Sequence, residues 1–127
     1  MLYVKEAHGT VDEVAQRLTA AAAARKFGVL ATHDLKDKMN AKGVAFDRQC
    51  RVLEVCNPAQ AKQVLEANMS ISTALPCRIS VYEEGGKVKV ATLLPTAVLA
   101  LFGNPELQSV AREVEQAVVQ IIDDACR

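Results

Sequence analysis

The sequence predicts an α+β fold, in which helices cover one face of a single, mostly antiparallel sheet. Two long segments, one near the start of the chain and one at its end, repeat apolar residues at helical spacing. Between them, short segments rich in β-branched residues are separated by turn residues, a pattern typical of strands. With 127 residues, half of them hydrophobic, the chain predicts a single domain over residues 1–127.

A β-α-β unit is expected to open the chain. Thr10 and Glu13 have the spacing of a capping box, in which each side chain accepts a hydrogen bond from the other residue's backbone N–H. The apolar stripe behind them predicts a helix and consists of Val11, Val14, Ala15, Leu18, Ala21 and Ala22. Strands over residues 2–7 and 27–32 bracket this helix.

The last segment predicts a long helix that reaches the C-terminus. Asn104 is expected to be its N-cap and Pro105 its first residue, where a missing N–H does no harm. Its stripe consists of Leu107, Val110, Ala111, Val114, Ala117, Val118, Ile121, Ile122 and Ala125. Because both long helices are apolar on one face only, each must cover a flat partner.

The middle of the chain supplies that partner. A short helix is expected over residues 34–42, a strand over 48–56 and a helix after Asn57 and Pro58. Residues 77–83 and 87–94 predict a hairpin around Gly85 and Gly86, since glycine supplies the positive φ of a tight turn. Residues 95–102 predict a short helix that is apolar nearly all round. Such a helix needs burial on several sides, against the core, another protomer or an apolar ligand.

Composition excludes several classes of protein. Lys and Arg number 15, as do Asp and Glu, so the formal charge is zero and we expect neither a nucleic-acid partner nor an anionic membrane surface. The longest uncharged stretch, residues 90–105, is interrupted by Pro95 and falls below the roughly 18 residues of a membrane span. The chain turns polar too early for a signal peptide, and its four cysteines then predict reduced thiols in the cytoplasm. No cofactor motif is present, so we expect no cofactor.

A candidate thiol site comprises Cys56, Cys77, Asn57 and Arg78. Cys56 ends one predicted strand and Cys77 begins a later one, so antiparallel neighbours would bring both thiols to the same end of the sheet. Asn57 starts a helix whose N-terminal dipole favours a thiolate at Cys56, and Arg78 adds a cation. The pair is interpreted as a redox couple, a soft-metal site or a reactive thiol. The alternative is that both are small core residues, as we expect for Cys50 and Cys126.

Other chemistry has weaker support. His8 and His33 each end a predicted strand, and a helical crossover would place both near one edge of the sheet as weak candidates for a metal site. Two histidines at loop entrances are more often solvated, and we expect no metal. Glu54 is the one acid in an apolar strand, and its expected role is a weak surface ion pair with Arg48 or Arg51. No catalytic residue can be assigned.

Two short motifs carry a family resemblance. Val55-Cys56-Asn57-Pro58-Ala59-Gln60-Ala61 and Leu75-Pro76-Cys77-Arg78-Ile79-Ser80-Val81-Tyr82, with the hairpin and Pro95, resemble the "domain of unknown function 302" family. That family has Cys-Asn-Pro after one strand and Leu-Pro-Cys-Arg opening the next, and the likeness covers about residues 27–95. It implies a compact fold similar to the TATA-binding-protein-like class, often paired as a dimer, and no reaction.

Three functions remain open. The first is a small homodimeric binding module for an apolar or amphipathic ligand, with an interface near residues 94–102 or on an open sheet face. The second is a thiol-dependent redox or sulfur-handling protein that uses Cys56 and Cys77. The third is a structural or interaction protein without a ligand. We expect that the chain is not an enzyme.

Overall fold

The computed structural model describes residues 1–127 and contains one five-stranded sheet. The strand order is β1-β5-β4-β3-β2, and all four pairings are antiparallel. The strands are β1 (Leu2–Ala7), β2 (Gly28–Asp34), β3 (Cys50–Cys56), β4 (Cys77–Glu84) and β5 (Lys87–Leu93). The predicted α+β class and antiparallel sheet are therefore confirmed.

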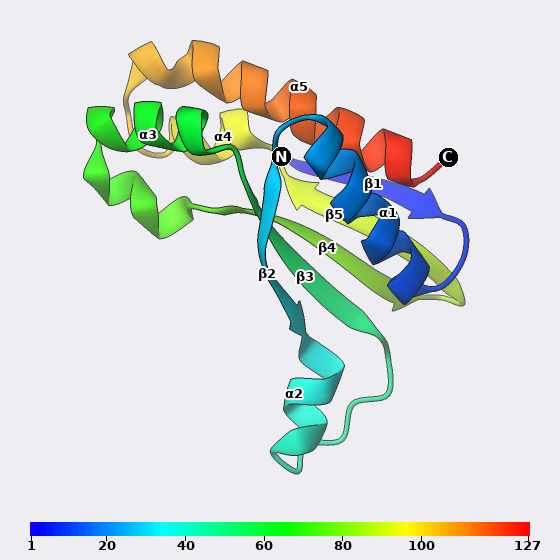
Figure 1. Cartoon of the computed structure of the whole chain (residues 1–127). Coiled ribbons are helices and arrows are strands. Elements are labelled where there is room, and N and C mark those ends of the chain that lie inside the picture. The colour runs from blue at the N-terminus through cyan, green and yellow to red at the C-terminus, as the bar shows by residue number, and fades with distance from the viewer.

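Two long helices cover one face of this sheet. Figure 1 shows α1 (Val11–Ala24) and α5 (Gln108–Ala125) lying across the strands on the same side. Alternate residues of the central strands face these helices, and Leu53, Ile79 and Val90 are at most 1 % exposed. They belong to the larger hydrophobic cluster, to which α5 adds Val118, Ile121 and Ile122.

A smaller hydrophobic cluster lies beyond the end of the sheet. It joins α3 (Pro58–Ala67), a 3-10 segment (Met69–Ala74), α4 (Pro95–Ala100) and the first half of α5. Its members are Val64, Ile71, Leu99, Leu107, Val110 and Ala111. Figure 1 shows α3 and α4 beneath the N-terminal half of α5, where they extend the helical layer past the strands. The sheet end beneath them, where β3 ends at Cys56 and β4 begins at Cys77, is called the thiol end below.

Local capping signals were mostly good predictors. The capping box of α1 is confirmed, since Glu13 N–H donates to Thr10 Oγ1 (3.1 Å) and Thr10 N–H to Glu13 Oε1 (2.9 Å). Asn57 caps α3 as expected. The prediction that Asn104 caps the last helix is wrong. A 3-10 turn over Pro105–Leu107 precedes α5, and the Asn104 side chain instead bonds to Asn68 and Glu106.

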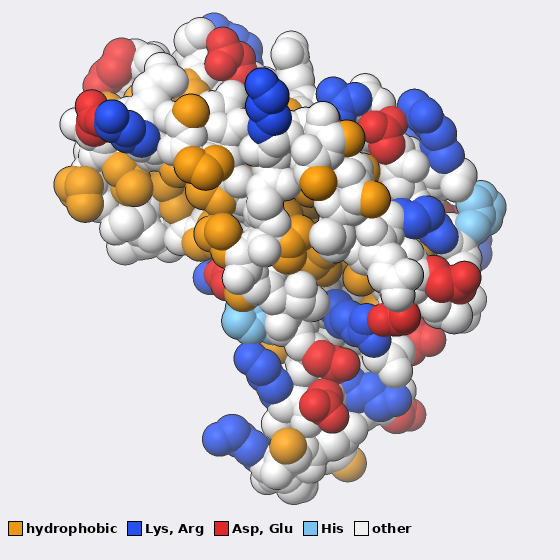
Figure 2. Space-filling view, in the orientation of Figure 1, with side chains coloured by type: hydrophobic (Ala, Val, Ile, Leu, Met, Phe, Trp, Pro, Cys, Tyr) orange, Lys and Arg blue, Asp and Glu red, His pale blue; other side chains and the backbone are white.

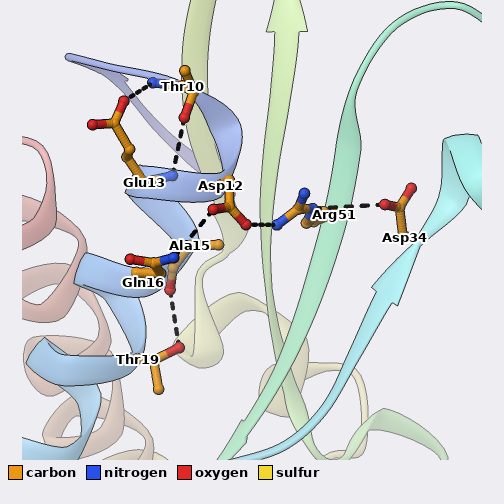
Figure 3. Close-up of polar contacts among 8 residues, drawn as sticks. All are labelled: Thr10, Asp12, Glu13, Ala15, Gln16, Thr19, Asp34 and Arg51. Atoms are coloured by element: carbon orange, nitrogen blue, oxygen red, sulfur yellow. Dashed lines mark hydrogen bonds and ion pairs between the residues drawn. The ribbon is translucent and has the colours of Figure 1, made fainter.

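At the opposite end of the sheet, the chain extends as an arm. Figure 1 shows β2 continuing into α2 (Leu35–Ala41), which projects away from the other helices and buries no residue. Arg51 of β3 ties the base of this arm to α1, because its guanidinium lies between Asp12 (2.6 Å) and Asp34 (3.7 Å), as Figure 3 shows. We call this the ion-pair end.

The second face of the sheet has no helical layer. Tyr3 and Lys5 of β1 reach Asp123 of α5, so their neighbours Leu2 and Val4 must face the opposite side. Leu2 is paired with Leu93 of β5, and the three apolar side chains, Leu2, Val4 and Leu93, are 42–58 % exposed. They define the open-face patch.

Candidate functional site

Two adjoining hollows lie at the thiol end. The inner hollow has a volume of about 40 Å³ and is lined by 13 residues, nine of them hydrophobic. They are Phe27, Val55, Cys56, Asn57, Gln60, Ala61, Val64, Leu75, Pro76, Cys77, Pro95, Leu99 and Val114. These residues come from the sheet end, α3, α4 and α5, so the cavity forms only where the smaller cluster meets the sheet.

The outer hollow is larger, with a volume of about 280 Å³. It is lined by Thr73, Ala74, Leu75, Pro76, Cys77, Arg78, Leu93, Pro95 and Val98. Leu75, Pro76, Cys77 and Pro95 line both hollows and form the wall between them. The Leu75–Pro76 peptide bond is cis, and Leu93 connects the outer hollow with the open-face patch.

The two candidate thiols lie together at the inner hollow. β3 and β4 are antiparallel neighbours with Val55 opposite Cys77, so Cys56 and Cys77 lie at the same end of the sheet, as the sequence predicted. Both are free and both line the inner hollow. Burial, with a smaller contribution from Cys56, raises the pKa of Cys77 from 9.0 to about 11. Burial also raises the pKa of Cys56. Both thiols are therefore neutral at pH 7, whereas a helix N-terminus had been expected to favour a thiolate.

Two amides lie beside Cys56. The Asn57 side chain accepts a hydrogen bond from Gln60 N–H (3.1 Å), so its oxygen is committed to capping α3. The Gln60 amide oxygen is buried and has no hydrogen-bond partner in the chain. Sequence reasoning missed Gln60, because nothing in its spacing distinguishes it from a solvated helix residue.

Arg78 is the one charged residue of either hollow. It follows Cys77 on β4, lines the outer hollow and is 66 % exposed. Its Nε lies 3.7 Å from Glu54 Oε2, which is an ion-pair distance too long for a hydrogen bond. The guanidinium therefore remains free to donate to another group.

Glu54 has different partners from those expected. Its side chain is 18 % exposed and pairs across strands with His33 of β2 (Nε2–Oε1, 3.0 Å) and with Arg78 of β4. The prediction of an ion pair with Arg48 or Arg51 is wrong, because neighbours on a sheet face come from adjacent strands. Lys38 of α2 lies 3.0 Å from His33 Nδ1 and donates to it, so Nε2–H of His33 donates to Glu54.

The remaining candidates are dispersed. His8 follows β1 and His33 lies on β2, and these are the two edge strands with three strands between them. β1 and β2 run parallel, as expected, so both histidines lie at the same end of the sheet, but three intervening strands keep them too far apart to share a metal ion. Cys126 is 8 % exposed and belongs to the larger cluster, and Cys50 lies 4.0 Å from the Ser80 hydroxyl. No group of three or more metal-ligating side chains occurs in the structure.

Hydrophobic and charged side chains occupy different regions of the surface. Figure 2 shows hydrophobic side chains gathered around α3 and the segment that follows it. Charged side chains gather instead over the lower part of the sheet and on α2. No helix combines the length and the apolar character that crossing a membrane requires.

Fold and site together define a small α+β protein with an antiparallel sheet, helices on one face and an apolar double hollow at one sheet end. A family profile described as "Domain of unknown function DUF302" matches residues 3–125, and the chain belongs to this family.

A solved structure supports the assignment. The crystal structure of an uncharacterized conserved DUF302 protein from Bacillus stearothermophilus is similar, with a TM-score of 0.93 and 31 % sequence identity. The match covers 99 % of this chain and 98 % of that one. A comparison with curated proteins finds no match.

Proposed function

We propose that the chain is a homodimeric, cytoplasmic binding module for a small apolar or amphipathic molecule, bound at the thiol end. The observation that carries this proposal is the pair of adjoining hollows, lined mainly by apolar side chains and separated by one wall. Apolar hollows with few polar groups are the usual form of small-molecule sites, because a ligand displaces poorly bonded water from them.

A neutral probe tests the binding site directly. Toluene added to the ¹⁵N-labelled protein is expected to shift the amide signals of residues around the outer hollow, such as Ala74, Cys77 and Val98. Val98→Phe fills this hollow and should abolish the shifts. Leu101→Phe is the matched control, since Leu101 is 78 % exposed and does not line either hollow. Shifts that are absent, or that survive Val98→Phe unchanged, contradict the proposal.

The proposed dimer uses the open-face patch. α4 is less available than the sequence suggested, because Leu99 is 6 % exposed and packs in the smaller cluster. Leu2, Val4 and Leu93 form an exposed apolar group on paired strands, and such groups mark interfaces between proteins. A two-fold axis would bring each patch against its own copy.

Light scattering at micromolar and higher concentrations tests the dimer. Val4→Lys is expected to give a folded monomer, whereas Leu101→Lys, at an exposed apolar site outside the patch, should leave the dimer intact. A wild-type monomer throughout this range overturns the proposal.

A second function has its own observation in its favour. Cys56 and Cys77 share one cavity, as a thiol-dependent redox or sulfur-handling protein requires. Iodoacetamide labelling against pH, analysed for each cysteine by mass spectrometry, tests it. Fast labelling of Cys56 and a Cys56–Cys77 linked peptide after mild oxidation would favour this function. Slow labelling of both cysteines excludes the thiol-dependent function. If toluene does not bind either, the remaining function is that of an interaction protein without a ligand.

A further inference from the structure

We infer that the outer hollow selects small carboxylic acids, whose apolar part packs against Leu75, Leu93 and Val98 while the carboxylate binds Arg78. This inference rests on the proposed binding function and narrows it to one class of ligand. It depends on three properties of the hollow: its charge, its free hydrogen-bond donors and its volume.

The charge of the hollow is positive. Arg78 is the one charged residue among its nine lining residues. Thr73, which also lines the hollow, already uses its hydroxyl proton in a hydrogen bond to Ser70 O at 2.8 Å. A polar ligand group therefore meets a cation that carries five N–H donors and no acceptor. This arrangement favours an anion over an amine or a neutral alcohol.

The guanidinium is restrained but not saturated. Glu54 lies 3.7 Å from Nε and forms its shorter contact, 3.0 Å, with His33. Glu54 therefore holds Arg78 at the rim without occupying its terminal N–H groups. A guanidinium edge presents two parallel donors, which match the two oxygens of a carboxylate. A phosphate dianion fits less well, because it would meet a single cation beside the negative charge of Glu54.

The volume suits a ring or a short chain. A cavity of about 150 Å³ lined by apolar side chains is known to hold benzene. The outer hollow, at about 280 Å³, therefore has room for a benzene-sized body with a carboxylate at its mouth. Benzoate is a suitable probe, and benzamide is its neutral counterpart of nearly the same shape.

Titrations followed by ¹H–¹⁵N spectra test the inference. Benzoate is expected to bind about tenfold more tightly than benzamide at low ionic strength, the gain typical of a charge-assisted hydrogen bond. Added salt should reduce that preference, since Arg78 is exposed. Benzylamine should bind more weakly than both.

Variants separate this inference from the proposed function. Arg78→Gln should remove the preference for benzoate over benzamide, while toluene binding to the wild type reports separately on the proposed function. Glu54→Gln should strengthen benzoate binding severalfold by removing a competing negative charge. Arg112→Gln, an exposed arginine on α5 outside both hollows, is the matched control and should change nothing.

Equal affinity for benzoate and benzamide, or an unchanged benzoate affinity in Arg78→Gln, overturns carboxylate selection while toluene binding still supports the binding module. If neither toluene nor benzoate perturbs the hollow, both proposals are wrong.

Discussion

The two ends of the sheet accommodate their ionisable side chains differently: the thiols at one end are buried, and the arginine at the other forms ion pairs. At the thiol end, Cys56 and Cys77 lie under α3, α4 and α5, and loss of water keeps both thiols neutral. At the ion-pair end, the half-buried Arg51 side chain lies between Asp12 and Asp34, and Asp12 is 58 % exposed. The same strands contribute to both ends, so the covering elements make the difference.

That contrast explains where a ligand site can form. An apolar hollow needs walls that exclude water without collapsing, and the smaller hydrophobic cluster supplies them at one end alone. The ion-pair end has an arm whose helix α2 buries no residue, and the hollow of about 180 Å³ at this end is lined mainly by polar and charged residues, among them Arg48, Glu83 and Glu84. Binding chemistry is thus expected at the thiol end, and the following experiments test this division.

The largest effect is expected from removing α5, because this helix serves both clusters. Val110 and Ala111 belong to the smaller cluster, and Val118, Ile121 and Ile122 to the larger. Each large buried side chain contributes about 1.5–3 kcal/mol, so their sum rivals the roughly 5–15 kcal/mol stability of a whole domain. A chain that stops before Asn104 should therefore be insoluble or unfolded. Cooperative melting of the truncated chain near the full-length temperature contradicts this prediction.

The second-largest effect is expected from a rise in pH, which should lower the free energy of unfolding through the buried thiol of Cys77. The pKa of Cys77 is about 11 in the folded protein and near its ordinary 9.0 when unfolded. Above pH 9 the unfolded chain therefore releases the thiol proton first, and stability falls until about pH 11. At 1.36 kcal/mol per pKa unit, the loss is about 2–3 kcal/mol.

Urea unfolding between pH 8 and 11 measures this loss. Tyrosines and lysines titrate in the same range, so Cys77→Ala is the control, and the wild type should lose more stability than this variant. Parallel curves for the two proteins would show that Cys77 is not dehydrated in the folded state.

Local structure was predictable from the sequence wherever one short segment determines it. The capping box at Thr10, the Asn57 cap and the Gly85-Gly86 turn depend on residues within three or four positions of one another. Asn104 failed as a cap because a distant residue, Asn68, bonds to its side chain. Tertiary contacts of this kind leave no signal in local spacing.

The candidate site was predictable only in part for the same reason. The antiparallel pairing of β3 and β4 brought Cys56 and Cys77 together as expected. The hollows themselves require α3, α4 and α5 to converge on the sheet end, and the partners of Glu54 come from two neighbouring strands. β1 adds to the sheet beside β5, which separates His8 from His33, and no short motif specifies that pairing.

A smaller effect is expected at the α1 cap, which lies at the ion-pair end. Thr10→Ala removes the hydrogen bond from Glu13 N–H shown in Figure 3, and should lower the free energy of unfolding by about 1 kcal/mol. Thr19→Ala is the matched control, since Thr19 donates to Ala15 O within the helix and alanine favours helix, so stability should not fall.

The capping box also predicts that the stability of the protein falls at acid pH. Hydrogen bonds from Thr10 hold the pKa of Glu13 below its ordinary value. The stabilisation is therefore present above the ordinary pKa and disappears as pH falls through the lowered one. Glu13→Gln cannot titrate, so the difference in unfolding free energy between wild type and this variant should change as pH falls through the lowered pKa, and a constant difference down to pH 2 in urea unfolding would contradict the capping role of the Glu13 carboxylate.

The smallest effect is expected at Arg51, although it has the most visible contacts. Arg51→Met breaks the ion pairs with Asp12 and Asp34, but Asp12 is 58 % exposed and exposed pairs contribute about 0–1 kcal/mol. Arg51 Nε is also buried without a hydrogen-bond partner, so methionine removes an unsatisfied donor and retains the packing of the side-chain stem.

The net loss of stability in Arg51→Met should be about 0.5 kcal/mol and should shrink in 1 M salt, whereas the alkaline loss caused by Cys77 should persist there. Urea unfolding at low and high salt measures both the loss in Arg51→Met and the alkaline loss caused by Cys77. A loss above 2 kcal/mol for Arg51→Met would mean that the ion-pair end is as strongly dehydrated as the thiol end, and the contrast between them would no longer hold.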